Sequence, residues 1–589
     1  MKSKMDNSYY SVVRNTQIVL SILKAKGIRK VVASPGTTNI SFVGSFMHDS
    51  YFTMYSAPDE RSAAYMACGL AAESGEPVVL TCTGATASRN YFPGLTEAFY
   101  RKLPVIALTS ALPLGRSGHL YPQFVDRSEQ PVDVVKCSVQ VGSIENAEDE
   151  WECITKINKA ILETMRHGGG PVHINISGGG EGYHFSVKEL PSTRIMTRYE
   201  SLKNAPQLPK GKIAIFIGAH KPFTFTQTAA IDRFCATHDA VVFVDHTSSY
   251  YGKYRVLYSI AAAQTIDDTN TKLDLLIHIG EVSGDYYTTN KLHASKEVWR
   301  VSPDGEIRDY FRKLTCIFEI EEEDFFIYYS AEGNSHTEFY VQCRKKLTEV
   351  YHSIGELPFS NIWSASVLST KMPSDCTIHF GILNSLRAWN FFELPIGVTT
   401  NCNVGGFGID GILSSVLGAS FVYPNKLYFC FVGDLAFFYD MNALGNRHVG
   451  KNLRIMLINN GKGTEFRNRT HPGSKFGDDA DLYIAAGGHY GRQSPTLVKH
   501  YAEDLGFRYI AAKNKEEFLA NIPIFLDSEY RDQSIIFELF TTHQQEDAAL
   551  ETIRHTLYNI NSDIKRSVKK AIKNVLGESI TESIKRIIK

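Results

Sequence analysis

The sequence lacks an excess of charge of either sign. Its 62 Lys and Arg residues face 63 Asp and Glu residues, which leaves a net charge of -1 on 589 residues. Proteins that bind nucleic acid or anionic membranes through their overall electrostatic field carry a clear positive excess. Composition therefore predicts no nucleic-acid partner, and the length predicts three to four domains with cores of their own.

Paired cysteines are also absent. The ten cysteines are scattered singly, and no two of them form a CxxC pair. Zinc sites and disulfide frameworks use recurring cysteine spacings, so the pattern argues against zinc and for unpaired thiols in a reducing compartment. We therefore expect a cytoplasmic protein. The cysteines are Cys68, Cys82, Cys137, Cys153, Cys235, Cys316, Cys343, Cys376, Cys402 and Cys430.

Long apolar runs are missing as well. No run of 18 apolar residues occurs, and the first 15 residues contain no apolar segment of the kind that signal peptides have. The sequence thus predicts neither a membrane span nor secretion. In the middle of the chain no GxGxxG motif occurs, since the one candidate turn, residues 218–220, reads Gly-Ala-His. We predict no dinucleotide in that region.

The most informative stretch that is present covers residues 427–461. An apolar strand, 427–432, ends beside Asp434, a helical pattern follows, and a second apolar strand, 453–458, ends beside Asn460. Parallel strands joined by a helix place both side chains at the carboxyl edge of a sheet, where open α/β folds bind ligands. Their oxygens suit Mg²⁺, which usually brings a phosphate with it. Alternatively, these are ordinary turn residues at strand ends.

The first 190 residues alternate strands and helices in the same way. Glycine turns follow two of the strands, as Ser-Pro-Gly at 34–36 and Thr-Gly at 83–84, and Asp59 is a predicted N-cap of the helix 61–73. Small residues on that helix indicate close backbone packing. The predicted strands are 30–33, 52–56, 78–81, 104–109 and 171–176.

Two further segments repeat this alternation, and the second has a glycine-rich turn, 403–411, that feeds a helix. Repeated alternation favours parallel sheets covered by helices on both faces. The predicted fold class is therefore α/β, with three doubly wound parallel-sheet domains and a helical C-terminal tail. The predicted boundaries are 1–190, 205–350 and 355–545 for the domains and 546–589 for the tail.

Short motifs in the first and third segments, in this order, resemble those of enzymes that depend on thiamine diphosphate (ThDP). They are most similar to the MenD family, the SEPHCHC synthases of menaquinone biosynthesis, and the resemblance covers roughly residues 10–545. The motifs are Ser-Pro-Gly (34–36), Asp-Glu-Arg-Ser-Ala (59–63), Thr-Gly (83–84), Asn-Ser-Leu (384–386), Gly-Ile-Asp-Gly (408–411), Gly-Asp-Leu (433–435) and Asn-Asn (459–460).

The resemblance implies ThDP and Mg²⁺ as cofactors and a pyrimidine-binding, a middle and a diphosphate-binding domain. It implies decarboxylation of a 2-oxoacid and transfer of the remaining fragment to a proton or a carbonyl acceptor, with the cofactor carrying the difficult chemistry. It also implies a homodimer or homotetramer, because in this family the pyrimidine-binding unit of one subunit faces the diphosphate-binding unit of another. In some branches the middle domain binds a flavin.

The resemblance assigns roles to particular residues. The catalytic pair is Glu60, which would hydrogen-bond the aminopyrimidine ring and is therefore expected to be buried among apolar groups, and Gln123 near the reacting centre. Asp434, Asn460 and the Lys462 carbonyl would hold the metal. The cofactor-binding positions are Gly36, Thr83, Gly84, Asn403, Gly408, Ile409, Asp410, Gly433, Asp434, Leu435 and Phe466. Glu465, at a position that is apolar in MenD, is a candidate to face the same cavity.

Three arginine positions that bind substrate carboxylates in MenD are changed. They correspond here to Thr37-Thr38, to Val404 and to the neighbourhood of Trp389. An arginine-carboxylate fork is poorly replaced by other side chains. We therefore predict a ThDP-dependent 2-oxoacid decarboxylase or carboligase, MenD-like in architecture but with another donor, such as pyruvate, and another acceptor.

Two alternatives stay open. The chain could be a SEPHCHC synthase in which Arg387, Arg89 or Arg116 replaces the missing arginines. It could also be a ThDP-binding scaffold without catalysis that acts through its basic amphipathic tail. That tail could lie peripherally on an anionic membrane, dock on a partner or pack on its own chain.

Overall fold

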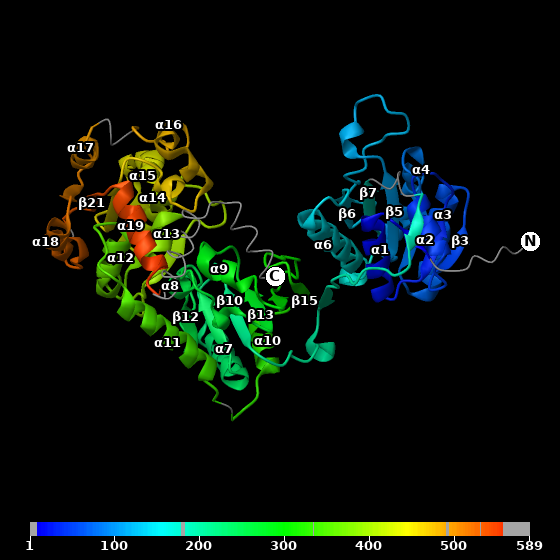
Figure 1. The fold of residues 1–589 in the computed structure, drawn as a ribbon, viewed down its shortest axis with the longest axis horizontal. Coiled ribbons are helices and arrows are strands. Elements are labelled where there is room, and N and C mark those ends of the chain that lie inside the picture. Colours follow the sequence, from blue (N-terminus) through cyan, green and yellow to red (C-terminus); the bar gives the residue numbers. More distant parts are fainter. Residues whose placement is uncertain (1–8, 178–182, 334, 490–493, 531, 558–589) are drawn as a thin grey trace, which may run out of the picture. The chain divides into compact units, whose positions relative to one another are not determined.

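The computed structural model describes residues 9–177, 183–333, 335–489, 494–530 and 532–557, and the basic stripe of the predicted tail, 562–589, lies outside them. The chain divides into two compact units (Figure 1). Unit 1 comprises residues 1–201 and 304–319, and unit 2 comprises 202–303 and 320–589. In the described residues, no helix has both the length and the apolarity needed to cross a membrane.

Unit 1 is built on a parallel sheet with the order β3-β2-β4-β5-β7-β6. Its strands are β1 (Tyr10–Ser11), β2 (Lys30–Ala33), β3 (Thr53–Ser56), β4 (Val78–Cys82), β5 (Val105–Ala111), β6 (Cys137–Val141), β7 (Val172–Ser177), β8 (Phe185–Val187), β9 (Thr197–Tyr199) and β15 (Leu314–Phe318). Its helices are α1 (Arg14–Ala25), α2 (Ile40–Met47), α3 (Glu60–Ser74), α4 (Thr86–Arg89), α5 (Phe92–Tyr100) and α6 (Ala147–Glu163).

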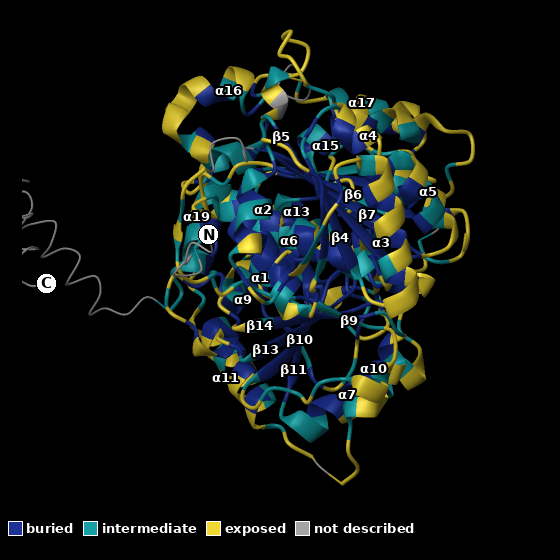
Figure 2. Cartoon of the chain, turned by 90° about the vertical axis from the view of Figure 1, so that its right-hand side faces the viewer, coloured by how far each residue is buried: buried dark blue, intermediate teal, exposed yellow. Residues whose placement is uncertain are grey.

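Both faces of this sheet are buried, which is why its strands read as continuous apolar runs (Figure 2). Val31 and Val79 point into one core cluster with α1, α2 and α6, whereas Val32 and Leu80 point into another with α3 and α5. Successive strand residues thus serve opposite cores. The predicted cap is also confirmed, because the Asp59 carboxylate accepts from the backbone N–H groups that begin α3.

Unit 2 contains a middle sheet and a third sheet. In the middle sheet five parallel strands of unit 2 lie in the order β12-β11-β10-β13-β14. They are β10 (Ile213–Ile217), β11 (Val241–Val244), β12 (Arg255–Leu257), β13 (Leu275–Ile279) and β14 (Glu297–Val301). The helices of this segment are α7 (Phe225–His238), α8 (Ser259–Ala262), α9 (Tyr286–Leu292), α10 (Glu322–Tyr329) and α11 (Glu338–Ser353).

The third sheet is parallel with the order β17-β16-β18-β19-β21-β20. Its strands are β16 (Thr377–Phe380), β17 (Thr399–Cys402), β18 (Tyr428–Gly433), β19 (Leu453–Asn459), β20 (Arg508–Ala512) and β21 (Ile535–Phe540). Its helices are α12 (Asn361–Leu368), α13 (Asn384–Trp389), α14 (Ile412–Ser420), α15 (Asp434–Asp440), α16 (Ala480–Tyr483), α17 (Leu497–Asp504), α18 (Lys515–Leu526) and α19 (His543–Arg554). The three parallel sheets confirm the predicted α/β class.

The helix α19 shows that the packed structure extends beyond residue 545. Its buried side chains, Ala549, Leu550 and Ile553, recur at helical spacing, so the helix presents one apolar face to unit 2. The Ile553 carbonyl accepts from the Gln264 amide at 2.8 Å. The first residues of the segment that we predicted as a tail therefore belong to unit 2.

Each sheet has a point near its centre where the strand order reverses, between β2 and β4, between β10 and β13, and between β16 and β18. At such a point the two loops that leave the carboxyl ends of neighbouring strands diverge and leave a crevice. Five positions that we predicted to bind the cofactor directly follow β2, β4 or β18, namely Gly36, Thr83, Gly84, Asp434 and Leu435, whereas the predicted positions 403–410 follow β17 and Phe466 follows β19. The strand order therefore places the predicted sites at the edges where this fold class binds ligands.

Candidate functional site

The predicted metal ligands meet at the reversal point of the third sheet. Asp434 begins α15 directly after β18 and is 4% exposed. Its Oδ2 accepts from the backbone N–H of Asn460 at 3.0 Å and of Gly461 at 2.5 Å, and its Oδ1 accepts from Leu435 N at 2.7 Å. Gly461 has φ +77°, a conformation that favours glycine, and this turn carries the backbone toward the carboxylate. The adjacency of Asp434 and Asn460 was predicted from the sequence.

A cavity of about 150 Å³ opens beside Asp434. Its oxygen donors include the Asp434 carboxylate and the buried Asn460 side chain, while the Lys462 ammonium pairs with Asp481. Carboxylate and amide oxygens are the donors that Mg²⁺ takes, so these residues fit a magnesium-bound diphosphate. Of the predicted positions, Ile409, Gly433, Asp434, Leu435, Asn460, Lys462 and Phe466 line this cavity.

Three of the cofactor residues predicted in the glycine-rich turn, 403–411, do not line the cavity. Gly408 and Asp410 are exposed, and a Cβ on Gly408 would stand 2.4 Å from the Asp410 carboxylate. Asn403 is half-buried and exchanges hydrogen bonds of 3.1 Å with Ser415 on α14. The glycine-rich turn therefore contributes to the cavity through Ile409.

Glu465, on the wall of this cavity, forms a charged pair with Arg387. The Arg387 guanidinium donates to both oxygens of Glu465, at 2.7 and 3.0 Å, and to the Asn384 side-chain oxygen at 2.8 Å. Burial opposes the charge of Arg387, but the hydrogen bonds and charge of Glu465 raise its pKa above the usual value. Glu465 and Asn384 line the cavity as predicted for Glu465. The arginine is thus engaged by a carboxylate of the protein itself.

One ionisable residue of this cavity, Glu546, was not predicted from the sequence. Glu546 on α19 accepts from the Asn361 backbone N–H at 3.1 Å and from the Thr541 hydroxyl at 2.7 Å. Burial, aided by the nearby Asp434 charge, raises the pKa of Glu546 to about 7. It lies after the last recognisable motif, 185 positions from Asn361, so no local pattern could indicate its place.

In unit 1 the positions predicted to hold the pyrimidine meet between β2 and β4. A Cβ on Gly36 would stand 2.3 Å from the Thr83 Cβ, so only glycine fits there. The Thr38 hydroxyl lies 2.8 Å from the Thr83 hydroxyl, donates to the Ser110 carbonyl at 3.0 Å and accepts from Gly84 N at 3.0 Å. One side chain thus ties the loops after β2 and β4 to the end of β5.

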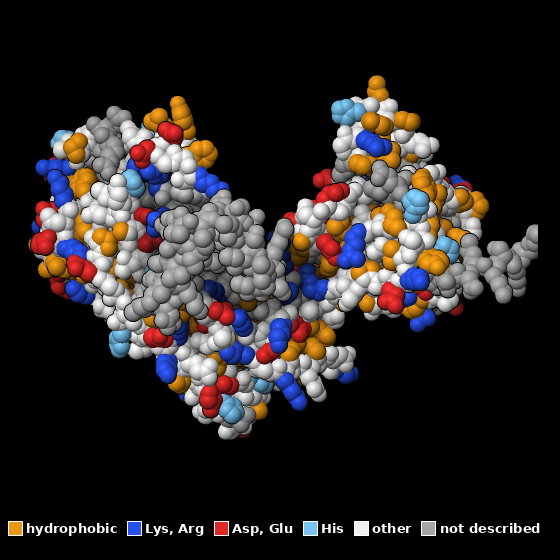
Figure 3. Space-filling view, in the orientation of Figure 1, with side chains coloured by type: hydrophobic (Ala, Val, Ile, Leu, Met, Phe, Trp, Pro, Cys, Tyr) orange, Lys and Arg blue, Asp and Glu red, His pale blue; other side chains and the backbone are white. Residues whose placement is uncertain are grey.

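The two predicted catalytic residues, Glu60 and Gln123, are both accessible to solvent in unit 1. Glu60 is half-buried at the start of α3, and the Asn90 amide lies 3.4 Å from its carboxylate. Unit 1 alone does not give Glu60 the apolar burial that we expected. Gln123 is exposed in the loop after β5, with φ +58°. Apolar side chains gather on this projecting loop (Figure 3), where Leu120 is 99% exposed.

The three changed arginine positions have structural roles in this chain. Thr38 bridges loops as described, and Val404 is buried and faces Gly284 across the packing between sheets of unit 2. Trp389 is fully buried, with its ring 4.0 Å from that of Phe431. None of these side chains carries a positive charge that could bind a substrate carboxylate. Of the candidate replacements, Arg387 is the one that pairs with a residue lining the cavity beside Asp434, namely Glu465.

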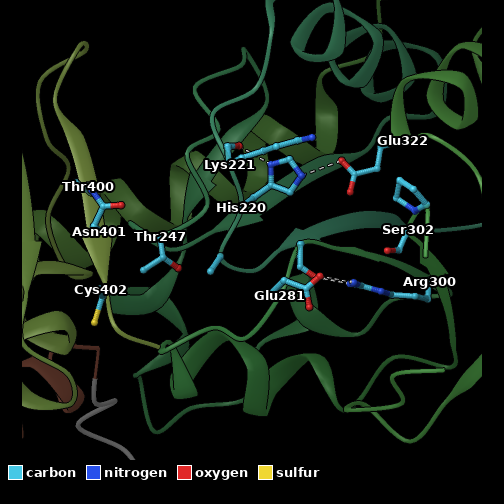
Figure 4. Close-up of a pocket in the computed structure, with 13 residues that line it drawn as sticks. His220, Lys221, Thr247, Glu281, Arg300, Ser302, Glu322, Thr400, Asn401 and Cys402 are labelled. Atoms are coloured by element: carbon cyan, nitrogen blue, oxygen red, sulfur yellow. Dashed lines mark hydrogen bonds and ion pairs between the residues drawn. The ribbon is translucent and has the colours of Figure 1, made fainter. Parts of the chain in front are cut away.

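The middle sheet carries a separate cavity of about 480 Å³ at its reversal point (Figure 4). His220 there lies 3.2 Å from Glu322, and Arg300 lies 3.4 Å from Glu281. Gly218 is required by loop packing, because a Cβ would stand 1.9 Å from the Glu281 carbonyl oxygen. The absence of a dinucleotide from this domain stays a prediction.

Comparison with known proteins gives consistent matches. Residues 14–130 match the family model described as "Thiamine pyrophosphate enzyme, N-terminal TPP binding domain". The chain is 31% identical over 564 residues to the 2-succinyl-5-enolpyruvyl-6-hydroxy-3-cyclohexene-1-carboxylate synthase of Bacteroides thetaiotaomicron, covering 93% of this chain and 99% of that protein. The synthase of Phocaeicola vulgatus is 31% identical over 567 residues, covering 94% and 100%. That of Flavobacterium psychrophilum is 28% identical over 564 residues, covering 92% and 98%.

Proposed function

Because this chain belongs to the thiamine pyrophosphate (ThDP) enzymes, among the 2-succinyl-5-enolpyruvyl-6-hydroxy-3-cyclohexene-1-carboxylate (SEPHCHC) synthases, we propose that it decarboxylates a 2-oxoacid and passes the remaining fragment to a carbonyl acceptor or a proton. ThDP with Mg²⁺ is the cofactor of this family. When bound, the cofactor supplies the carbon nucleophile and the electron sink that decarboxylation needs. The observation that carries the proposal is the adjacency of Asp434 and Asn460 in a cavity with oxygen donors.

Different residues of this chain would hold the metal, bind the pyrimidine and orient the substrate. Asp434, Asn460 and the Lys462 carbonyl would hold Mg²⁺ on the diphosphate, and Phe466 would flank the cofactor. The edge formed by Gly36, Thr83 and Gly84 would bind the pyrimidine, with Glu60 holding a proton at the ring and Gln123 orienting the substrate. These roles follow the family motifs, and the positions of Asp434, Asn460 and Phe466 on the wall of one cavity support the assignment of the diphosphate site.

Glu60 and Gln123 need a second surface to enclose them, because both are accessible in unit 1. We propose that a second copy of the chain supplies it, in a homodimer or homotetramer whose pyrimidine-binding unit faces the diphosphate-binding unit of the partner. The exposed apolar loop after β5 supports this proposal, since large apolar patches commonly mark interaction surfaces. The ten free cysteines support a reducing, cytoplasmic setting.

The proposed donor is a small 2-oxoacid such as pyruvate. Glu465 already occupies the guanidinium of Arg387, and the other arginine positions hold Thr38, Val404 and Trp389. A second substrate carboxylate would have to displace Glu465, whose side chain is 20% exposed, and separate it from its counter-ion, which is unfavourable. The cavity beside Asp434 therefore favours a 2-oxoacid without a second carboxylate.

A second candidate is the reaction named for the relatives, SEPHCHC synthesis. It is supported by their match over nearly the whole chain. In that case Arg387 would release Glu465 when the dicarboxylic donor binds.

One experiment tests both candidates. Purified protein with ThDP and Mg²⁺ is incubated with pyruvate or with 2-oxoglutarate, each alone and with isochorismate, while CO₂ release and product masses are recorded. Release from pyruvate that Asp434→Ala abolishes would support the main proposal. Efficient formation of the relatives' product would establish the second candidate. If neither donor loses CO₂, the proposal of catalysis on these substrates fails.

A further inference from the structure

Unit 1 contains a cavity of about 270 Å³ beneath the segment 126–131, and it is lined by Arg89 and Arg127, neither of which has a carboxylate partner in the part of the chain that the structure describes. We infer that this cavity, the Arg127 cavity, binds the carboxylate or phosphate group of a small molecule, with Arg127 as its fixed ligand and Arg89 as a second, mobile ligand. The remaining wall includes Ser88, Thr109 and His173.

Arg127 is the central observation. It is 3% exposed, and its guanidinium donates to Ser88 Oγ at 3.1 Å and to the Ser110 carbonyl at 3.4 Å. Its Nε finds no acceptor among the described residues. A guanidinium offers five N–H donors in a fixed fork that matches the oxygens of a carboxylate or phosphate. Three of those donors are therefore left for a ligand.

A buried charge without a counter-ion is unfavourable, so its presence calls for a partner. Among the described residues no ion pair involves Arg127 or Arg89. Burial lowers the pKa of Arg127, and the neighbouring Arg89 lowers it further. Burial and the Arg127 charge also lower the pKa of His173 to about 3, which keeps that ring neutral. The wall thus carries two guanidinium groups that form no ion pair with any described residue.

Two acidic residues also line the cavity, and both are exposed. The Asp126 carboxylate accepts from the backbone N–H and hydroxyl of Ser128, at 2.9 and 2.7 Å, which lowers its pKa. Glu129 lies in solvent, where water screens its charge. The buried Cys82 thiol, with a pKa raised to about 12 by burial, is neutral and supplies no counter-charge.

The cavity adjoins the edge that we propose for the pyrimidine. The Ser110 carbonyl accepts from both Arg127 and Thr38, and a Cβ on Gly84 would stand 3.3 Å from Arg127 Nη2. Asn90, the residue after Arg89, donates to Glu60. This adjacency favours an anionic group of a substrate, and that assignment of the ligand, unlike the site itself, rests on the proposed function.

The direct test is anion binding to the full-length protein without ThDP or Mg²⁺. We expect inorganic phosphate and acetate to raise the Tm, with a rise that grows with the logarithm of anion concentration above the Kd. Arg127→Met should weaken phosphate binding by about tenfold or more, the usual effect of losing a charged hydrogen-bond donor. Arg89→Gln, at an exposed position that does not threaten folding, should weaken it by a smaller factor.

The Tm of the free variant separates a ligand site from a structural arginine. Methionine fills the same space without an uncompensated charge, so Arg127→Met should leave the Tm unchanged or raise it. A structural arginine would instead give a lower Tm and an unchanged phosphate shift, which would overturn the inference. Arg101→Met is the matched control, because Arg101 is exposed, pairs with Glu97 and lies outside the cavity. No shift in the wild type with either anion would also overturn it.

Kinetics then identify the source of the anion. A raised KM with kcat nearly unchanged in Arg89→Gln would identify a substrate group, whereas an unchanged KM with lost phosphate binding would identify a separate anionic ligand. Either result would support an anion-binding site at the Arg127 cavity. Failure of the proposed decarboxylation would leave the binding measurements intact, so the two proposals can fail separately.

Discussion

Replacing Glu546 with glutamine should stabilise the cofactor-free protein above about pH 4.5, with the full effect above pH 7. Its pKa is raised from 4.5 to about 7 in the folded state, mainly by burial. A difference of this size corresponds to about 3 kcal/mol, at about 1.4 kcal/mol for each pKa unit. Because the folded pKa lies above the unfolded one, this group favours folding fully below pH 4.5, and that contribution is lost as the pH rises through 7.

A glutamine at position 546 cannot ionise, but its carbonyl oxygen can keep the hydrogen bonds that Oε1 of Glu546 accepts. Oε1 of Glu546 accepts from both Asn361 N and the Thr541 hydroxyl, so the single carbonyl oxygen of an amide can serve both donors. We therefore expect Glu546→Gln to match the wild type near pH 4.5 and to exceed its unfolding free energy by up to about 3 kcal/mol at pH 8.

The assay is urea unfolding at a series of pH values without ThDP or Mg²⁺, followed by tryptophan fluorescence. Trp363 lies on α12, two residues from Asn361, and reports on this region. Glu516→Gln on α18, an exposed carboxylate, is the control and should show no comparable pH dependence. An equal stability difference between Glu546→Gln and wild type at pH 5 and pH 8 would refute the reasoning, since it would show that ionisation is not the cause.

Three further outcomes are expected. ThDP with Mg²⁺ should raise the Tm of the wild type but not of Asp434→Ala, because the diphosphate is held through the metal; an unchanged shift would remove the metal assignment. Glu60→Gln should bind ThDP yet turn over about 100-fold more slowly, the usual contribution of a general acid or base, and full activity measured by CO₂ release would contradict its role. Glu465→Gln should free Arg387 and raise the kcat/KM for 2-oxoglutarate relative to pyruvate by about tenfold or more; a constant ratio would show that the pair does not select the donor.

The sequence was sufficient for features whose cause is local. Continuous apolar runs predicted the strands, and the spacing of Asp434 and Asn460 predicted their adjacency, because a βαβ unit has one handedness and brings the two strand ends together. The Asp59 cap was likewise predictable from residue type and position.

Other features depend on distant partners. Arg387 and Glu465 are 78 positions apart, and Glu546 and Asn361 are 185 positions apart, so no periodicity links them. The strand order was also beyond a local pattern, because it is decided by which faces of which helices pack together. The burial of Glu60 was expected from a role that unit 1 alone does not complete.

Thr38 has a consequence for how substrate preference can change. Its hydroxyl joins the loops after β2 and β4 to the end of β5 before any ligand arrives, so this edge is pre-organised and loses little conformational freedom on binding. Restoring the arginine that the resemblance places there would therefore do two things at once, adding a guanidinium and releasing the loops. An arginine at this position would therefore need compensating changes around Thr83 and Ser110 to keep the edge ordered.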